Sequence, residues 1–238
     1  MNAFDFSILS FLNRFEGQYP SFDKALLSLC AASAFLKAGL IVALYWWAWF
    51  RHGEDVNKNR AAREIIISAM AACVASLIIT RLIVLALPFR IRPLCDPANG
   101  LHFPQDASVN WQNWSSFPSD HAMMYFTLTT CLFFICRRLG WIALLDSVFL
   151  VCLPRIYLGL HYPTDVLAGA AMGTGIGFVA NQKTVKSFIA ERPLQWMQKY
   201  PGPFYAACFL LMYQVTTMFS DVVYVALAVI RHCKSLFH

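Results

Sequence analysis

The sequence predicts an all-α, polytopic membrane protein built as a bundle of six transmembrane helices. Hydrophobic residues make up 58% of the 238 residues and charged residues only 13%, far from the balance of a soluble domain of this length. Long apolar runs occur about six times, and a helix needs roughly 20 residues to cross about 30 Å of hydrocarbon. Residues 1–238 are therefore expected to form one integral-membrane domain, without a second, soluble one.

The first fifteen residues predict an amphipathic helix that lies in the membrane interface. Apolar residues recur there at helical spacing, whereas a basic leading region and a small-residue cleavage site are missing. The recurring residues are Phe4, Ile8, Phe11, Leu12 and Phe15. We therefore expect an interfacial helix at this end of the sequence and no secretory signal.

Six spans are expected in order after this helix. They lie within residues 25–50, 64–88, 119–137 and 141–158, from about 161 onwards, and within 204–230. The first ends in an aromatic belt, residues 45–49, which marks one membrane surface. The fifth contains Gly169, Gly173 and Gly177 at four-residue spacing, which predicts the close approach of a neighbouring helix.

The Lys and Arg residues indicate the orientation of the spans. The connections after spans one, three and five hold four, two and four of the nineteen in the chain. Basic connections stay in the cytoplasm. The segments around Arg92, Ser119 and His161 are therefore expected at the opposite surface. This pattern predicts a multi-pass plasma (inner) membrane protein whose site faces the periplasmic or extracellular side.

The polar residues expected to meet at that outer surface combine anion binding with acid–base chemistry. They are Arg90, Arg92, Ser119, Asp120, His121, Arg155, His161 and Asp165. Arginine presents a fork of donors that matches phosphate oxygens, and a helix beginning at Ser119 would add free backbone amides. Two histidines supply a nucleophile and a proton donor, which binding alone does not need.

The spacing suggests a role for each titratable group. His161 and Asp165 are four residues apart, so on one helix the carboxylate would accept a proton from one imidazole nitrogen and leave the other free to attack phosphorus. His121 would protonate the departing oxygen. Arg92 and Arg155 would stabilise the charge of the transferring group. No metal and no cofactor are expected, because no carboxylate cluster suits magnesium.

Other uses of the chain are less favoured. The formal charge of +6 is not gathered on one amphipathic or disordered segment, so we expect no nucleic-acid partner. The eight cysteines lie mostly within apolar runs and form no Cys-x-x-Cys, which is typical of small hydrophobic residues rather than of metal ligands.

Three blocks of residues resemble the type 2 phosphatidic acid phosphatase superfamily of lipid phosphate phosphatases. The family pattern is Lys-x6-Arg-Pro, then Pro-Ser-Gly-His, then Ser-Arg-x5-His-x3-Asp. This sequence has Arg92-Pro93, Pro118-Ser119-Asp120-His121 and Arg155-x5-His161-x3-Asp165 within a core from about 64 to 180. The resemblance implies a six-helix fold and a phosphohistidine at His161, oriented by Asp165. It also implies an acid at His121 and phosphate contacts from Arg92, Ser119 and Arg155.

Three positions depart from the family pattern. The first-block lysine corresponds to Leu85, the third-block serine to Pro154, and the second-block glycine to Asp120. The candidates for the missing lysine are Lys37, Arg81 and Arg90, and we favour Arg90 because it needs no deep burial. Asp120 resembles the form found in bacterial members similar to undecaprenyl-diphosphate phosphatases.

These features predict a phosphatase that acts on a lipid phosphate or diphosphate whose headgroup lies at the outer surface while its chain stays in the bilayer. Undecaprenyl diphosphate, a carrier in cell envelope biogenesis, is the favoured substrate. Phosphatidic acid, phosphatidylglycerol phosphate and a lipid A phosphate remain alternatives. Leu85 and Pro154 also allow a catalytically weakened protein that binds or transports lipids.

Overall fold

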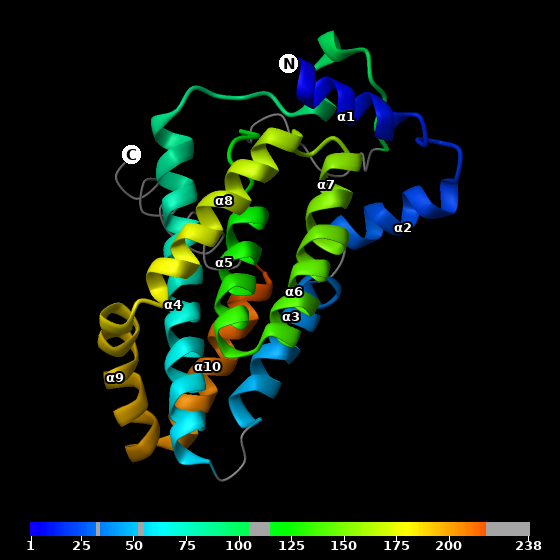
Figure 1. Cartoon of the computed structure of the whole chain (residues 1–238). Coiled ribbons are helices and arrows are strands. Elements are labelled where there is room, and N and C mark those ends of the chain that lie inside the picture. The colour runs from blue at the N-terminus through cyan, green and yellow to red at the C-terminus, as the bar shows by residue number, and fades with distance from the viewer. Residues whose placement is uncertain (32–33, 52–54, 105–114, 218–238) are drawn as a thin grey trace, which may run out of the picture.

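The computed structural model describes residues 1–31, 34–51, 55–104 and 115–217, and within these ranges it is helical without any strand (Figure 1). The α-helices are α1 (Ala3–Asn13), α2 (Pro20–Ala31), α3 (Ala34–Phe50), α4 (Val56–Ala86), α5 (Asp120–Ile135), α6 (Arg137–Leu145), α7 (Leu153–Tyr157), α8 (Pro163–Ala180), α9 (Lys183–Lys199) and α10 (Pro201–Thr216). A π-helix, Asp146–Cys152, joins α6 to α7, and two 3₁₀ turns, Pro93–Cys95 and Pro97–Asn99, follow α4. The predicted all-α class is confirmed.

Several predicted boundaries were wrong. The first expected span, 25–50, is two helices, and α2 begins earlier, at Pro20, because proline is well suited to a first helical turn. Helix α4 begins before the apolar run, at a cap where Asp55 accepts a hydrogen bond from the Lys58 amide at 3.1 Å. The last part of the expected sixth span, 218–230, lies outside the described residues.

The basic connection expected after the fifth span is a helix, α9. Its sequence is rich in strong helix formers, and it tolerates one internal proline, Pro193. Ala190 and Leu194 are buried in the main hydrophobic core, and α9 packs against α4. The exposed face of α9 carries basic residues. A count of charges alone therefore indicated a connection and not a helix with an apolar face.

Among the described residues, two continuous helical segments are long and apolar enough to cross a membrane. They are Val56–Ala86, which is α4, and Arg137–Tyr157, which comprises α6, the π-helix and α7. Large apolar side chains are exposed on both, including Leu82, Leu85 and Trp141. Such surfaces suit hydrocarbon better than water. The arrangement as six spans stays a prediction.

Helix α5 is the central helix and packs most extensively against α8 and α4 (Figure 1). The contact with α8 depends on the face of α8 that carries glycine residues. A Cβ atom at Gly169 would lie 2.5 Å from the Ser119 carbonyl oxygen, and one at Gly173 would overlap the Met123 carbonyl. The predicted close approach at these glycines is confirmed, and it fixes the start of α5 against the start of α8.

The polar residues gather at one end of the bundle. The first turns of α5 and α8, the last turn of α7 and the segment after α4 all lie there, beneath α1 (Figure 1). Helix α1 packs on α7 and α8, and its Leu9 is fully buried beside Phe103 and Tyr162. The expected N-terminal helix therefore exists, and its place in the membrane interface stays a prediction.

Candidate active site

His161 lies in the turn between α7 and α8 and is 3% exposed. Its Nδ1 is 2.8 Å from the backbone carbonyl oxygen of Ser116. Because a carbonyl can only accept, Nδ1 carries the proton and Nε2 presents a lone pair. Burial and the positive charge of Arg92 lower the pKa of His161 to about 3. The imidazole is therefore neutral at physiological pH.

Asp165 does not bind His161 directly, which corrects the expectation from their spacing. Its Oδ2 is 4.0 Å from His161 Nδ1, beyond hydrogen-bond reach. The same oxygen accepts hydrogen bonds from the Ser116 hydroxyl and, at 2.9 Å, from the Tyr162 amide. His161 precedes α8 instead of lying on it, so the helical i, i+4 argument does not apply. Ser116 joins the two groups, one through its carbonyl and the other through its hydroxyl.

His121 lies in the first turn of α5 and is paired with its neighbour Asp120. The imidazole Nδ1 is 2.8 Å from Asp120 Oδ1, and the His121 amide donates to the same oxygen at 2.8 Å. Asp120 Oδ2 also lies 3.6 Å from a guanidinium nitrogen of Arg81. A carboxylate in this place favours the protonated imidazole.

Arg92 and Arg155 are both buried and both act electrostatically on His161. Arg92, 7% exposed, donates to the Leu160 carbonyl at 2.8 Å, and Arg155, 4% exposed, donates to the Val151 carbonyl at 2.8 Å. These bonds orient both guanidinium groups. Burial lowers the pKa of Arg92, and both arginines act electrostatically on His161. A buried cluster of positive charge next to a neutral imidazole is suited to a multiply charged anion.

Ser119 occupies the N-cap of α5, as expected. Its hydroxyl accepts a hydrogen bond from the Ala122 amide at 3.4 Å, and its own amide donates to the Asp165 carbonyl at 3.2 Å. The side chain is fully buried. The cap therefore links the start of α5 to the first turn of α8.

Arg90 occupies a different place from the one expected for a phosphate ligand. One guanidinium nitrogen binds Asp165 Oδ1 and, at 3.1 Å, the Thr164 hydroxyl, and the other lies 2.9 Å from Asp5 Oδ2. The guanidinium carbon stands 4.1 Å from the centre of the Tyr162 ring. Two carboxylates therefore share this guanidinium, which leaves it poorly suited to hold a phosphate as well.

The three departures from the family pattern have distinct positions. Leu85 is 83% exposed on α4, so a side chain there faces outwards, whereas Arg81 on the same helix reaches Asp120. The side chain of Lys37 lies outside the described residues. Pro154 lies just after the π-helix. A π-helix is wider than an α-helix, so its turn leaves space for the proline ring that follows. Asp120 is compensated by His121 and Arg81, not by Arg90.

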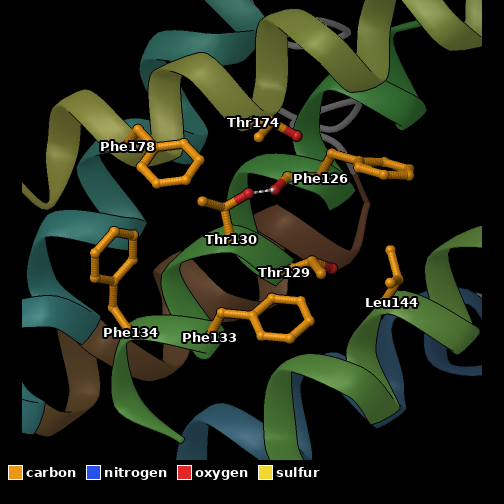
Figure 2. Close-up of a pocket in the computed structure, with 8 residues that line it drawn as sticks. All are labelled: Phe126, Thr129, Thr130, Phe133, Phe134, Leu144, Thr174 and Phe178. Carbon is orange, nitrogen blue, oxygen red and sulfur yellow. Dashed lines mark hydrogen bonds between the residues drawn. The ribbon is translucent and has the colours of Figure 1, made fainter. Parts of the chain in front are cut away.

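One apolar hollow among the described residues is lined by none of these charged groups. Figure 2 shows this hollow of about 310 Å³ between α5, α6 and α8, lined by Phe126, Thr129, Thr130, Phe133, Phe134, Leu144, Thr174 and Phe178. Its phenylalanine rings face the hollow, and the Thr130 hydroxyl is turned back to the Phe126 carbonyl at 2.7 Å. The lining contains no titratable side chain, so this hollow is not the place of the chemistry.

Sequence reasoning missed Ser116 and Asp5. Ser116 acts partly through its backbone carbonyl, which any residue could provide, and its only signal was its place at the start of the polar stretch before His121. Asp5 stands far away in the sequence, on a helix interpreted from its apolar residues alone. The signal in the sequence was an acid among apolar residues, and the structure buries that acid fully.

Comparison with known proteins identifies relatives for the core of the chain. Residues 66–189 match the model of the PAP2 superfamily. The bacitracin transport permease protein BcrC of Bacillus licheniformis is 42% identical over 59 residues, 25% of this chain and 29% of that protein. The undecaprenyl-diphosphatase BcrC of Bacillus subtilis (strain 168) is 31% identical over 121 residues, 51% of this chain and 58% of that protein.

A longer match is found with the putative undecaprenyl-diphosphatase YbjG of Escherichia coli (strain K12), which is 29% identical over 175 residues, 72% of this chain and 76% of that protein. The matches to the two BcrC proteins span less than two thirds of their lengths. No solved structure matches. The matched core contains both histidines, Arg92, Arg155 and Asp165, whereas Asp5 lies outside it.

Proposed function

Since the chain belongs to the PAP2 superfamily, we propose that it is a membrane phosphatase that hydrolyses undecaprenyl diphosphate to undecaprenyl phosphate and inorganic phosphate. The observation that carries this proposal is the state of His161: a buried, neutral imidazole whose Nδ1 proton is held by the Ser116 carbonyl and on which Arg92 and Arg155 act electrostatically. The names of the Bacillus subtilis and Escherichia coli relatives favour the polyprenyl diphosphate over other lipid phosphates.

The reaction proceeds in two displacements. In the first, the Nε2 lone pair of His161 attacks the terminal phosphorus, and the bond between that phosphorus and the bridging oxygen breaks. His121 gives its proton to the departing oxygen, so that undecaprenyl phosphate leaves. Arg92 and Arg155 hold the three equatorial oxygens during the transfer.

The second displacement restores the enzyme. The now neutral His121 takes a proton from water, whose oxygen attacks the phosphohistidine. The nitrogen–phosphorus bond breaks, inorganic phosphate departs, and His161 regains its lone pair while His121 is again protonated. Asp120 stabilises the imidazolium at both ends of this cycle, since its carboxylate is 2.8 Å from the ring nitrogen.

Arg81 takes the place of the missing family lysine in this proposal. Its guanidinium is half exposed and lies next to Asp120, whereas Arg90 is shared by two carboxylates. A diphosphate has more charge to bind than a monophosphate, and an arginine at the rim of the site would meet the second phosphate. Lys or Arg at this rim would therefore contribute to the choice of substrate.

The proposed orientation puts the site at the periplasmic or extracellular surface of the plasma membrane, with the polyprenyl chain in the bilayer. The support is the positive charge of the connections expected on the cytoplasmic side, of which 183–199 is the helix α9. Accessibility of cysteines placed at Asn99 and Lys186 to a membrane-impermeant thiol reagent in intact cells tests the orientation, with labelling at Asn99 alone as the expected result.

Phosphate release from purified protein in detergent tests the activity. The panel comprises undecaprenyl diphosphate, phosphatidic acid, phosphatidylglycerol phosphate and lipid A, and the diphosphate is expected to turn over fastest. His161→Ala should abolish release without loss of the folded state. A protein that binds these lipids and releases phosphate from none of them would be the lipid-binding or transport alternative, in keeping with the permease name of one relative.

A further inference from the structure

Helix α1 places a buried carboxylate, that of Asp5, against the first turn of α8. Asp5 is 0% exposed, and its Oδ1 accepts from the Thr164 amide at 2.9 Å while its Oδ2 accepts from the Thr164 hydroxyl at 2.7 Å. Asn2 adds a hydrogen bond at 3.0 Å. Thr164 lies in the first turn of α8, so Asp5 satisfies an amide that the helix leaves free.

Asp5 is also linked to Asp165 through Arg90. One nitrogen of the guanidinium lies 2.9 Å from Asp5 Oδ2 and the other binds Asp165 Oδ1. The opposite oxygen of Asp165 accepts from Ser116, whose carbonyl holds His161 Nδ1. A continuous series of hydrogen bonds therefore runs from α1 to the nucleophile.

This series has an electrostatic reason. Burying a carboxylate is costly unless it is paired and hydrogen-bonded, and Asp165 is fully buried. Arg90 compensates Asp165, but a single guanidinium between α4 and α8 needs its own fixed position. Asp5 binds the other nitrogen of the guanidinium, and the centre of the Tyr162 ring lies 4.1 Å from its carbon.

We propose that Asp5 is a positioning residue for the phosphatase reaction, which acts through Arg90 to hold Asp165 and, by way of Ser116, the ring of His161. Helix α1 is then part of the catalytic apparatus, although it lies outside the matched core of residues 66–189. The inference rests on the proposed phosphohistidine mechanism. Asp5 does not touch phosphate, so its loss should slow the chemical step and leave substrate binding unchanged.

The first test compares two substitutions on α1. Asp5→Asn keeps the size of the side chain and removes its charge, and we expect kcat to fall about 10–100-fold, the usual cost of losing a group that orients a catalytic residue. The KM and the inhibition constant of inorganic phosphate should change less than about two-fold. The matched control is Asn13→Ala, because Asn13 tethers the other end of α1 to the His102 backbone.

A tether alone gives a different result. If α1 only stabilised the fold, Asp5→Asn and Asn13→Ala would lower the melting temperature and the amount of active protein alike, with kcat per folded molecule unchanged in both. That outcome overturns the inference. A fall in kcat for Asp5→Asn alone supports it.

The second test is a double-mutant cycle with Arg90→Gln. If Asp5 acts through Arg90, then Asp5→Asn should cost less than about two-fold in kcat once Arg90 is gone, whereas losses that multiply would overturn the inference. Arg90→Lys serves if Asp5→Asn does not fold: an ammonium group cannot bridge both carboxylates with separate nitrogens, so kcat should fall with KM unchanged. Wild-type kcat in Arg90→Lys would contradict the inference.

The cycle also separates this inference from the mechanism on which it rests. Activity that survives in His161→Ala would remove the phosphohistidine mechanism itself. If His161→Ala is inactive but the losses in kcat of Asp5→Asn and Arg90→Gln multiply in the double variant, the phosphohistidine mechanism stands and only the proposed role of Asp5 is excluded. The assays use whichever lipid phosphate the wild-type protein hydrolyses fastest, so an error in the choice of lipid does not affect them.

Discussion

His161 and Asp165 are joined through Ser116, whose carbonyl oxygen lies 2.8 Å from His161 Nδ1 and whose hydroxyl binds Asp165 Oδ2. The backbone carbonyl fixes which nitrogen carries the proton, and the carboxylate fixes the segment that supplies the carbonyl. The orientation of the His161 ring therefore depends on the backbone at Ser116 as well as on Asp165.

Ser116→Ala should lower kcat about ten-fold and leave KM nearly unchanged. The substitution removes the hydrogen bond to Asp165 but keeps the carbonyl that holds His161, so the imidazole retains its tautomer and loses part of its support. Steady-state phosphate release measures the effect. The control is Ser68→Ala, which removes an equally buried hydroxyl that donates to the Ala180 carbonyl at 2.7 Å, far from the histidines. Equal kcat in the two variants would show that Ser116 has no special role.

Protonation of His161 should limit activity only in strong acid. Its pKa is lowered from the usual 6.5 to about 3, so the nucleophile stays neutral from physiological pH down to nearly that value. In a profile of kcat/KM against pH, no acid limb near pH 6.5 should belong to His161. Arg92→Gln removes a positive charge that lowers the pKa of His161, so a limb at pH 6 to 7 that moves to higher pH in this variant would contradict this assignment.

The same depressed pKa has a consequence for stability. Between pH 6.5 and about 3 the unfolded chain binds a proton at His161 that the folded protein does not, so this residue destabilises the fold as the pH falls through that window. His161→Gln removes the titration. The melting temperature of the wild-type protein should therefore fall more steeply from pH 7 to pH 5 than that of the variant, as measured by thermal unfolding in detergent. Parallel curves would exclude the linkage.

Asp120→Asn should affect substrates according to their leaving groups. The carboxylate supports protonated His121, 2.8 Å away, and proton donation matters most when the departing oxygen is strongly basic. The variant should lose about ten-fold or more in kcat on phosphatidic acid, whose leaving group is an alkoxide, and less on undecaprenyl diphosphate, which releases a phosphate. His121→Ala should show the same order of losses, larger in size. A uniform loss on both lipids would favour a purely structural role for Asp120 at the start of α5.

The sequence predicted a group of histidines and arginines from residue type and spacing. The segments that carry them, the first turn of α5, the last turn of α7, the turn before α8 and the segment after α4, lie at one end of the bundle (Figure 1), and their catalytic roles stay a prediction. Their connections were less predictable, since the Ser116 carbonyl belongs to the backbone and the pairing of Asp5 with Arg90 joins residues far apart in the chain. Those contacts arise only when α1, α4 and α8 pack together.

The helix count shows the same limit in the fold. Apolar runs located α4 and α8, since each is long enough for its composition to dominate. They could not reveal α9, because its mixed composition resembles a cytoplasmic connection and its helical state depends on packing against α4. The contact at Gly169, Gly173 and Gly177 was predicted because glycines at four-residue spacing lie on one face of a helix and allow a neighbouring helix to approach closely.

Gly173→Ala should destabilise the fold by about 1–3 kcal/mol, the usual cost of overpacking a tight contact, because the added methyl group overlaps the Met123 carbonyl and forces α8 away from α5. Gly175→Ala on the same helix is the control. A Cβ there meets nothing within 4 Å, so alanine should stabilise the helix by about 0.5–1 kcal/mol. Thermal unfolding in detergent should show a lower melting temperature for Gly173→Ala than for the wild-type protein, and no decrease for Gly175→Ala. Activity should follow, because Ser119 and His121 are positioned by the same contact between α5 and α8. Wild-type stability in Gly173→Ala would mean that α5 and α8 are not in close contact at Gly173.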